Sequence, residues 1–443
     1  MATATLQSDD PVSGTRLKRL GPAFEQRDFR LWWLALLGMG VSLQMVEVAI
    51  GWEVYALHRS ALDLGWIGLA EFVPLFVLAL PAGQVADRMP RRLIFAGALW
   101  LSAAVSGGLA GVTAAGTTHV WVYLALAVGA GIAMALGWPA SRAMPPTLVS
   151  VEQLPNAMAL RSIGGQIGMV FGPAIGGLLY GVSPVLVYLV AAGCCVLASG
   201  AVLAMHPRPA ADAPRVDPLS SQTASVEGVL EGLRFVARTQ VLLGAILLDL
   251  LAVLFGGAVA LLPVFARSIL HVGAAGLGVL RAAPAVGALL AAIFITRHPI
   301  TRRTGRTLLV AVGLYGASIV VFGLSRVFWI SLLALGFSGF VDLYSVNIRS
   351  TLVALASPDR LRGRVNAVEM VFISASNQLG AFESGLAAFL VGTLPAVIGG
   401  GVATMLIAIS WGRLFPALAG VDRLEDLSPE EPARAELGLA ASG

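Results

Sequence analysis

Long apolar segments alternate with short polar breaks along most of this chain. Twelve such segments are present, six in each half, and each has about the 20 residues that a helix needs to cross the hydrocarbon core of a bilayer. They occupy residues 30–57, 64–86, 92–115, 119–141, 157–181, 184–205, 241–266, 275–296, 306–325, 328–350, 364–391 and 393–413. The pattern therefore predicts an all-α integral membrane protein with twelve transmembrane helices.

The polar breaks divide the chain into five regions. We expect an N-terminal tail over 1–29, a six-helix bundle over 30–205, a linker over 206–240, a second six-helix bundle over 241–413 and a C-terminal tail over 414–443. Within the linker, apolar residues recur at helical spacing from Val226 to Val236. This spacing predicts a short amphipathic helix that lies on the membrane surface.

The two halves resemble each other between their fourth and fifth segments. Arg142, Thr147-Leu148-Val149 and Asn156 in the first half match Arg349, Thr351-Leu352-Val353 and Asn366 in the second. A duplication of this kind suggests two six-helix pseudo-repeat bundles around a cavity at the bilayer midplane.

The positive charges predict the orientation. If the N-terminus is cytoplasmic, 25 of the 29 Lys and Arg residues fall in the tails and the cytoplasmic loops. By the positive-inside rule, both termini and the linker face the cytoplasm. The net charge of +4 then reflects topology and contact with anionic membrane lipids, and it does not support nucleic-acid binding.

Composition narrows the function classes. The chain is 57% hydrophobic and 12% charged, against the roughly 25% charged residues of an ordinary soluble domain, which argues against a soluble enzyme. The single lysine, Lys18, is not part of a phosphate-binding loop, so ATP-driven transport is not expected. Cys194, Cys195 and the five histidines form no recognisable metal or nucleophile pattern. We expect no catalytic residue, no metal and no cofactor.

Ionisable side chains inside apolar segments are costly, so each is a candidate for function. Those that could carry protons are Glu47, Asp249, Asp342 and Glu383. Those that could line a cavity or form ion pairs are Gln44, Arg281, Ser345, Arg349 and Asn377. For all of them a hydrogen-bonded packing residue or a structural ion pair remains an open alternative, and Glu53, Glu71 and Glu369 rank lower.

Residues 83–92, Gly-Gln-Val-Ala-Asp-Arg-Met-Pro-Arg-Arg, resemble the signature loop of the major facilitator superfamily. The resemblance assigns a conformational latch to Gly83, Asp87, Arg88, Arg91 and Arg92. The equivalent loop of the second half, 302–306, lacks the aspartate. The resemblance also implies that the first, fourth, seventh and tenth helices line the cavity, which favours Glu47, Asp249 and Asp342 among the carboxylates.

A second motif lies in the fifth segment. Residues 168–177 resemble the motif of the superfamily's antiporters and drug exporters through Gly168, Gly172, Pro173, Gly176 and Gly177. Proline and glycine make a helix thin and kinked, so a neighbouring helix can pack closely against it. Ordinary small-residue packing is the alternative, and Ala159 stands where the family pattern has a glycine.

Residues 52–57, 280–288 and 376–385 are similar to the branch of the superfamily that contains the enterobactin exporter and related bacterial efflux proteins. This resemblance and the motif of the fifth segment imply a secondary active exporter in a bacterial inner (plasma) membrane. Together with the carboxylates inside the apolar segments, they predict proton-coupled export of small amphipathic or hydrophobic compounds of the drug or siderophore type. We expect a monomer. The alternatives are a facilitator, importer or lipid flippase of the same fold, and a transport-inactive receptor or scaffold.

Overall fold

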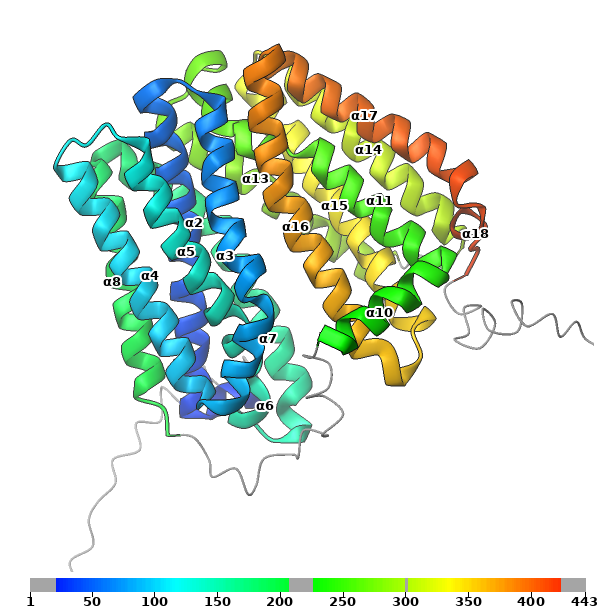
Figure 1. Ribbon diagram of the computed structural model, residues 1–443, viewed down its shortest axis with the longest axis horizontal. Coiled ribbons are helices and arrows are strands. Elements are labelled where there is room, and N and C mark those ends of the chain that lie inside the picture. The colour runs from blue at the N-terminus through cyan, green and yellow to red at the C-terminus, as the bar shows by residue number, and fades with distance from the viewer. Residues whose placement is uncertain (1–20, 207–225, 299–301, 424–443) are drawn as a thin grey trace, which may run out of the picture.

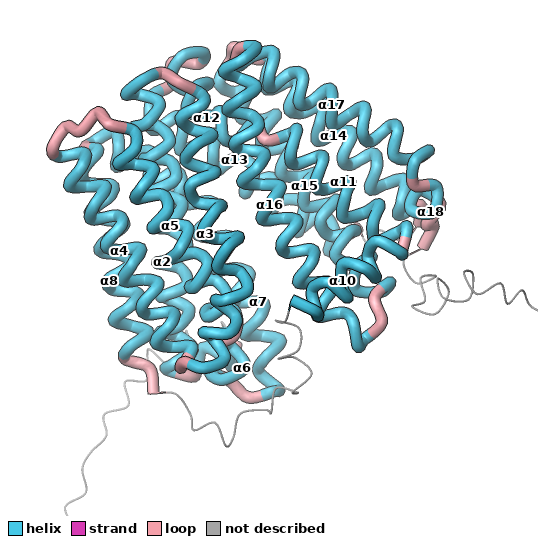
Figure 2. Tube along the Cα trace, in the orientation of Figure 1, coloured by secondary structure: helices cyan, strands magenta, loops and turns pink. Residues whose placement is uncertain are grey.

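A computed structural model describes residues 21–206, 226–298 and 302–423. Every regular element in this part of the chain is a helix (Figure 2). In the first half the long helices are α2 (Arg27–His58), α3 (Ala61–Arg88), α4 (Arg91–Ala114), α5 (Val120–Arg142), α7 (Leu154–Val182) and α8 (Pro184–Leu203). Three short helices cover the loops between them: η2 (Pro22–Glu25), α6 (Pro145–Leu148) and η3 (Val151–Gln153).

The second half begins with the amphipathic helix α10 (Val226–Arg238). Its long helices are α11 (Gln240–Gly256), α13 (Gly273–Arg297), α14 (Thr304–Leu324), α15 (Phe328–Ala356), α16 (Asp359–Val391) and α17 (Thr393–Leu414). Short elements follow α11 and α17: η5 (Ala258–Leu261), α12 (Leu262–Val264), η6 (Phe265–Ile269) and α18 (Pro416–Ala419).

The twelve predicted segments all correspond to helices. Eleven helices in the described part are long and apolar enough to cross a membrane, the segment from Gln240 to Ile269 being one of them. The remaining helix, α16, is 33 residues long but less apolar, because it carries charges such as Glu369 and Glu383. The prediction of an all-α membrane fold is therefore confirmed.

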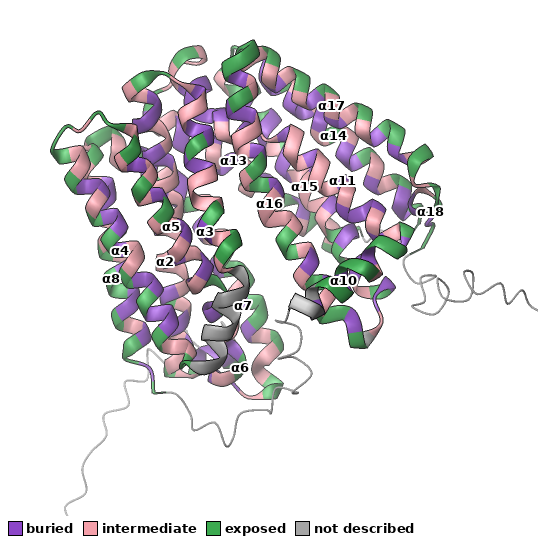
Figure 3. Ribbon diagram, viewed as in Figure 1, coloured by how far each residue is buried: buried purple, intermediate pink, exposed green. Residues whose placement is uncertain are grey.

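The helices pack in two groups that follow the chain (Figure 1). In the first half, α2 packs on α7 and α8, while α5 packs on α3 and α4. In the second half, α13 and α14 pack on α15, and α17 packs on α14 and α11. Two helix pairs, α3 with α16 and α7 with α13, connect the groups. The outward face of α17 carries exposed apolar residues such as Leu406 and Ile409, as expected for a surface in contact with lipid (Figure 3).

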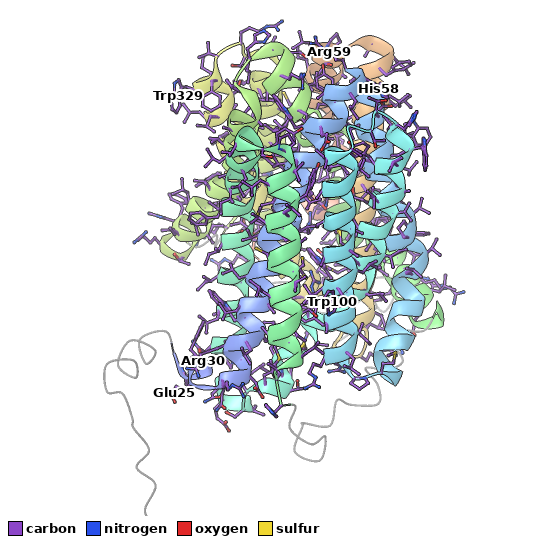
Figure 4. All side chains as sticks on the ribbon, turned by 90° about the vertical axis from the view of Figure 1, so that its left-hand side faces the viewer. Glu25, Arg30, His58, Arg59, Trp100 and Trp329 are labelled. Atoms are coloured by element: carbon purple, nitrogen blue, oxygen red, sulfur yellow. The ribbon has the colours of Figure 1, made fainter. Side chains whose placement is uncertain are left out.

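The two groups are held together mainly at one end. Glu25 and Arg30 lie at the end where α2 begins, which we call the amino-terminal end, and Arg59 and Trp329 lie at the opposite, far end (Figure 4). At the far end, one buried apolar cluster contains residues of both halves, including Tyr55 and Phe265. The hydroxyl groups of Tyr55 and Ser268 are also hydrogen-bonded there, 2.8 Å apart.

The seventh segment is not the continuous helix that the sequence predicted. Helix α11 ends at Gly256, and the chain continues through short 3₁₀, α and π turns to Ile269. A Cβ atom at Gly257 would lie 3.1 Å from Ser384 Oγ, so α16 approaches the backbone closely at the break. The hydroxyl of Tyr315 donates to the Gly256 carbonyl at 3.1 Å. This bond satisfies a carbonyl that the interrupted helix leaves free.

The predicted helix of the linker is present as α10, but it packs on protein. Val236 is buried with residues of α11 and α16, and the Glu231 carboxylate pairs with Arg364 of α16. Leu230 and Leu233 remain exposed on the same helix. The linker helix therefore packs on α16, and its position on the membrane surface stays a prediction.

Part of the predicted C-terminal tail belongs to the second bundle. Leu418 is fully buried, and the backbone N–H of Arg303 donates to Asp422 Oδ1 at 2.9 Å. Arg303 has a positive φ of 54° at the start of α14. The C-terminal segment therefore brings an aspartate to the loop that lacks one in its own sequence.

Candidate functional site

An ion pair joins the two halves in the interior of the molecule. The Arg281 guanidinium on α13 donates to the Glu47 carboxylate on α2. The Arg281 side chain is 19% exposed and the Glu47 side chain is 23% exposed, so both charged groups are largely buried. The two residues are separate candidates in the sequence, and the structure brings them together.

Two further side chains complete this site. Glu71 on α3 interacts electrostatically with both Glu47 and Arg281, and it is hydrogen-bonded to Gln378 on α16. Two helices from each half therefore converge on one set of charges, which we call the inter-half cluster. It contains two carboxylates and one guanidinium, so a single bound proton makes it neutral.

A second set of charges lies wholly within the second half. The Arg349 guanidinium is 4% exposed and contacts Asp249 of α11 and Glu369 of α16, the latter at 3.3 Å. Asp342, also on α15, interacts electrostatically with Asp249 and Arg349. We call these four residues the second-half cluster. Three carboxylates around one guanidinium leave this cluster with an excess of negative charge unless protons bind.

The other predicted site residues lie outside both clusters. Ser345 is buried on α15. Asn377 donates to the Ile373 carbonyl of its own helix at 2.9 Å. The Glu383 carboxylate accepts a hydrogen bond from the neighbouring Ser384 at 3.5 Å. Gln44 lines a cavity in the first half. Their predicted roles in transport stay predictions.

The signature loop lies at the amino-terminal end, between α3 and α4. Arg91 donates to the Ala143 carbonyl after α5 at 3.1 Å, and Arg92 donates to the Met205 carbonyl after α8. These contacts tie the loop to its own half. The side chains of Asp87 and Arg88 and the surroundings of Gly83 lie outside what the structure describes, so the latch stays a prediction.

The glycines of the antiporter-type motif face two different neighbours. Cβ atoms at Gly168, Gly172 and Gly176 would lie 3.2 Å or less from backbone or side-chain atoms of α2. Gly177 instead faces Ala274 and Gly278 of α13, and the Pro173 carbonyl lies against Gly278. The motif thus allows α7 to approach both α2 and the opposite half.

Glu71 and Glu369 ranked low among the sequence candidates, and Gln378 stood only within the motif 376–385, yet the structure places all three in the two clusters. All three lie inside predicted helices. Glu71 and Glu369 are ionisable, and the cost of burying a charge is the feature of the sequence that indicates a role for them. The partners could not be inferred, because they come from helices far apart in the chain. Among the described residues, no group of three or more His, Cys, Asp or Glu side chains could hold a metal ion.

Glu53 forms a separate network inside the first half. Its carboxylate accepts hydrogen bonds from Thr113 at 2.7 Å, Tyr123 at 2.9 Å and Tyr188 at 2.7 Å. The residue is 7% exposed, although its position near the end of α2 suggested contact with water. Three donors from α4, α5 and α8 satisfy the carboxylate, so the network joins four helices of one bundle.

Comparisons with known proteins agree with this architecture. The sequence profile of a family described as transmembrane secretion effectors matches residues 19–435. The enterobactin exporter EntS of Citrobacter koseri is 26% identical over 383 residues, covering 84% of this chain and 88% of that protein.

Solved structures share the fold. A bacterial homologue of the human lysosomal transporter Spinster, in an inward-facing and occupied conformation, has a TM-score of 0.67 at 14% identity and covers 93% of this chain and 98% of its own. The nucleoside transporter NupG has a TM-score of 0.63 at 14% identity, with 88% and 98% covered.

Proposed function

Because this chain belongs to the family of transmembrane secretion effectors, within the major facilitator superfamily of transporters, we propose that it is a proton-coupled exporter. Its substrates would be small amphipathic or hydrophobic compounds of the drug or siderophore type. The similarity to a protein named as an enterobactin exporter supports the direction of transport. In this proposal a monomer works in a bacterial inner membrane, with both termini in the cytoplasm.

The observation that carries the proposal is the inter-half cluster. Glu47 and Arg281 hold α2 and α13 together while the far end is closed. A proton that binds Glu47 or Glu71 removes one negative charge and weakens the attraction between the halves. Loss of that proton restores the attraction. Proton binding and the relative position of the halves are therefore linked, as coupled transport requires.

Alternating access follows from where the halves touch. Glycine contacts between α3 and α16 and between α7 and α13 close the far end. We propose that substrate enters from the amino-terminal end, that protonation of the inter-half cluster loosens the far-end contacts, and that rocking of the bundles then opens the far end. The second-half cluster offers Asp249, Asp342 and Glu369 as further proton acceptors on this path.

The test is substrate-dependent proton movement in proteoliposomes. A pH dye inside the vesicles reports flux while siderophores, antibiotics and lipophilic cations are added one at a time. We expect flux with wild-type protein and none with Glu47→Gln, because the amide cannot exchange a proton. Glu53→Gln is the matched control, since Glu53 lies in a network inside one bundle.

The outcomes separate transporter classes. Substrate movement without proton flux, unchanged in Glu47→Gln and Asp342→Asn, would overturn proton coupling and favour a facilitator or a flippase. Proton flux that persists in Glu47→Gln and stops in Asp342→Asn would move the coupling site to the second-half cluster.

A further inference from the structure

The first half contains a cavity that none of the proposed proton-coupling residues lines. Its volume is about 270 Å³, and it lies between α2, α5 and α7. Its lining residues are Leu36, Met39, Gly40, Leu43, Gln44, Trp138, Ser141, Arg142, Arg161, Ser162, Gly165 and Met169. The cavity is near the amino-terminal end, because Leu36 lies in the first turns of α2 and Arg142 ends α5.

Two arginines face this cavity without a carboxylate partner among the described residues. The Arg142 guanidinium lies over the Trp138 ring, 5.3 Å from its centroid, and its Nη1 is 3.4 Å from the Met370 sulfur. A thioether is a weak acceptor, so most of the five N–H donors remain available. Arg161 makes no hydrogen bond or ion pair with any residue that the structure describes. The two positive charges repel each other.

The corresponding helices of the second half show the opposite arrangement. There, the arginine of the fourth helix, Arg349, pairs with a carboxylate of the fifth helix, Glu369. In the first half, the arginine of the fourth helix, Arg142, faces a second arginine of the fifth helix, Arg161. The second half supplies a carboxylate for its arginine, whereas the described part of the first half supplies none for Arg142 or Arg161.

An unpaired neutral donor lies beside the arginines. Ser141 is 3% exposed and lines the same cavity, but its hydroxyl has no hydrogen-bond partner. Buried hydroxyl groups are normally satisfied, so an unpaired one in a cavity wall is suited to a ligand acceptor. Gln44 adds an amide to the same wall. Apart from Ser162, the rest of the lining is apolar or glycine, chiefly Leu36, Met39 and Met169.

We propose that this cavity binds the acidic group of an anionic amphiphile, a carboxylate or phosphate, between Arg142 and Arg161. Arginine presents paired donors that match such groups. The Ser141 hydroxyl donates a further bond, and the apolar lining holds the adjoining part of the ligand. The inference rests on the proposed export function and names its substrate class. The same acidic chemistry could come from a transported compound or from a phospholipid headgroup.

Calorimetric titration of the purified full-length protein in neutral maltoside micelles tests the charge requirement. The probes are octanoate and octyltrimethylammonium, which have alkyl chains of similar length and opposite charge, with empty micelles as the blank. We expect octanoate to bind and the cation to bind at least about tenfold more weakly. Arg142→Gln and Arg161→Gln should each weaken octanoate about tenfold or more, whereas Arg326→Gln, an exposed arginine at the far end, should not.

Conservative variants keep this test valid if a glutamine variant fails to fold. Arg142→Lys and Arg161→Lys retain the charge but lose the paired donors, so they should bind octanoate with intermediate affinity. Ser141→Ala should weaken octanoate and leave octyltrimethylammonium unchanged. Equal binding of the two probes, or octanoate binding that is unchanged in both arginine variants, would overturn the proposal.

A second measurement identifies the source of the acidic group. Native mass spectrometry counts phospholipids retained by wild type and by Arg161→Gln after purification. A retained lipid that octanoate displaces, and that the variant has lost, assigns the site to a headgroup. Octanoate binding without a retained lipid assigns it to transported compounds. The calorimetric titration needs no proton gradient, so it is independent of the transport assay. If octanoate binds as expected but no proton-coupled transport is found, only the proposed function is overturned.

Discussion

Gly177 of α7 and Gly278 of α13 lie directly against each other across the boundary between the two halves. A Cβ atom at Gly177 would be 3.0 Å from the Gly278 Cα atom and would also collide with the Ala274 carbonyl oxygen. Only a residue without a side chain allows this approach. The antiporter-type motif therefore ends on a contact that exists when the far end is closed.

Gly177→Val should open that contact. Overpacking of this kind costs about 1–3 kcal/mol, which shifts a two-state equilibrium by roughly 5- to 150-fold toward the far-end-open state. Spin labels at Ser60→Cys and Arg326→Cys, with Cys194 and Cys195 replaced by serine, should report a longer distance. Gly181→Val is the control, because a Cβ there meets nothing within 4 Å. An unchanged distance in Gly177→Val would contradict the assignment.

Glu47 and Arg281 should be energetically coupled. Removing either partner takes the directly bonded counter-charge from the other, so Glu47→Gln and Arg281→Gln should each destabilise the protein by about 1–3 kcal/mol. The double variant should lose less than the sum of the two, as thermal unfolding in detergent would show. Additive losses would mean that the pair contributes nothing to holding the halves together.

Substitution of Arg349 should lower the stability of the protein far more than substitution of an exposed arginine. Arg349→Gln leaves Asp249 and Glu369 buried without a counter-charge, and breaking a buried pair in this way costs roughly 3–5 kcal/mol. Arg297→Gln, at the exposed end of α13, should change the unfolding temperature little. Arg349→Lys should fall between them, because lysine keeps the charge without the planar donor group. A similar melting temperature for all three would refute the second-half cluster as a stabilising centre.

The Glu53 network should affect stability without affecting transport. Tyr123→Phe and Tyr188→Phe each remove one hydrogen bond to a carboxylate, worth about 1.5–3 kcal/mol. Tyr180→Phe, which removes none of these bonds, serves as the reference. Melting temperatures should fall for the first two variants while proton flux per folded protein stays at the wild-type level. Loss of flux in Tyr188→Phe would place Glu53 on the proton path.

Much of the fold could be predicted because the bilayer imposes a simple length rule on apolar segments. The helices begin and end within a few residues of the predicted positions, apart from the break after Gly256 and the six-residue extension of α15 to Ala356. At Gly257 the chain is still apolar, so hydropathy contains no signal for the break. The glycine pair at 256–257 permits the break, and α16 packs closely against the backbone there.

The candidate site could be predicted only in part. Glu47, Arg281, Asp249 and Arg349 stood out because charge inside an apolar segment is costly. Which charges meet depends on helix packing, and that information is not local. Arg142 and Arg161 were not predicted as site residues, because arginines near helix ends are ordinarily interpreted as indicators of membrane orientation.

The break in the seventh segment also constrains how the second bundle can move. Backbone groups freed at Gly256 and Gly257 must stay shielded from hydrocarbon, and here Tyr315 and the close-packed α16 shield them. A motion that pulled α16 away from α11 would uncover the interrupted backbone at Gly257. We therefore expect α11 and α16 to stay packed together, so that motion between the halves occurs at the contacts of α3 with α16 and of α7 with α13.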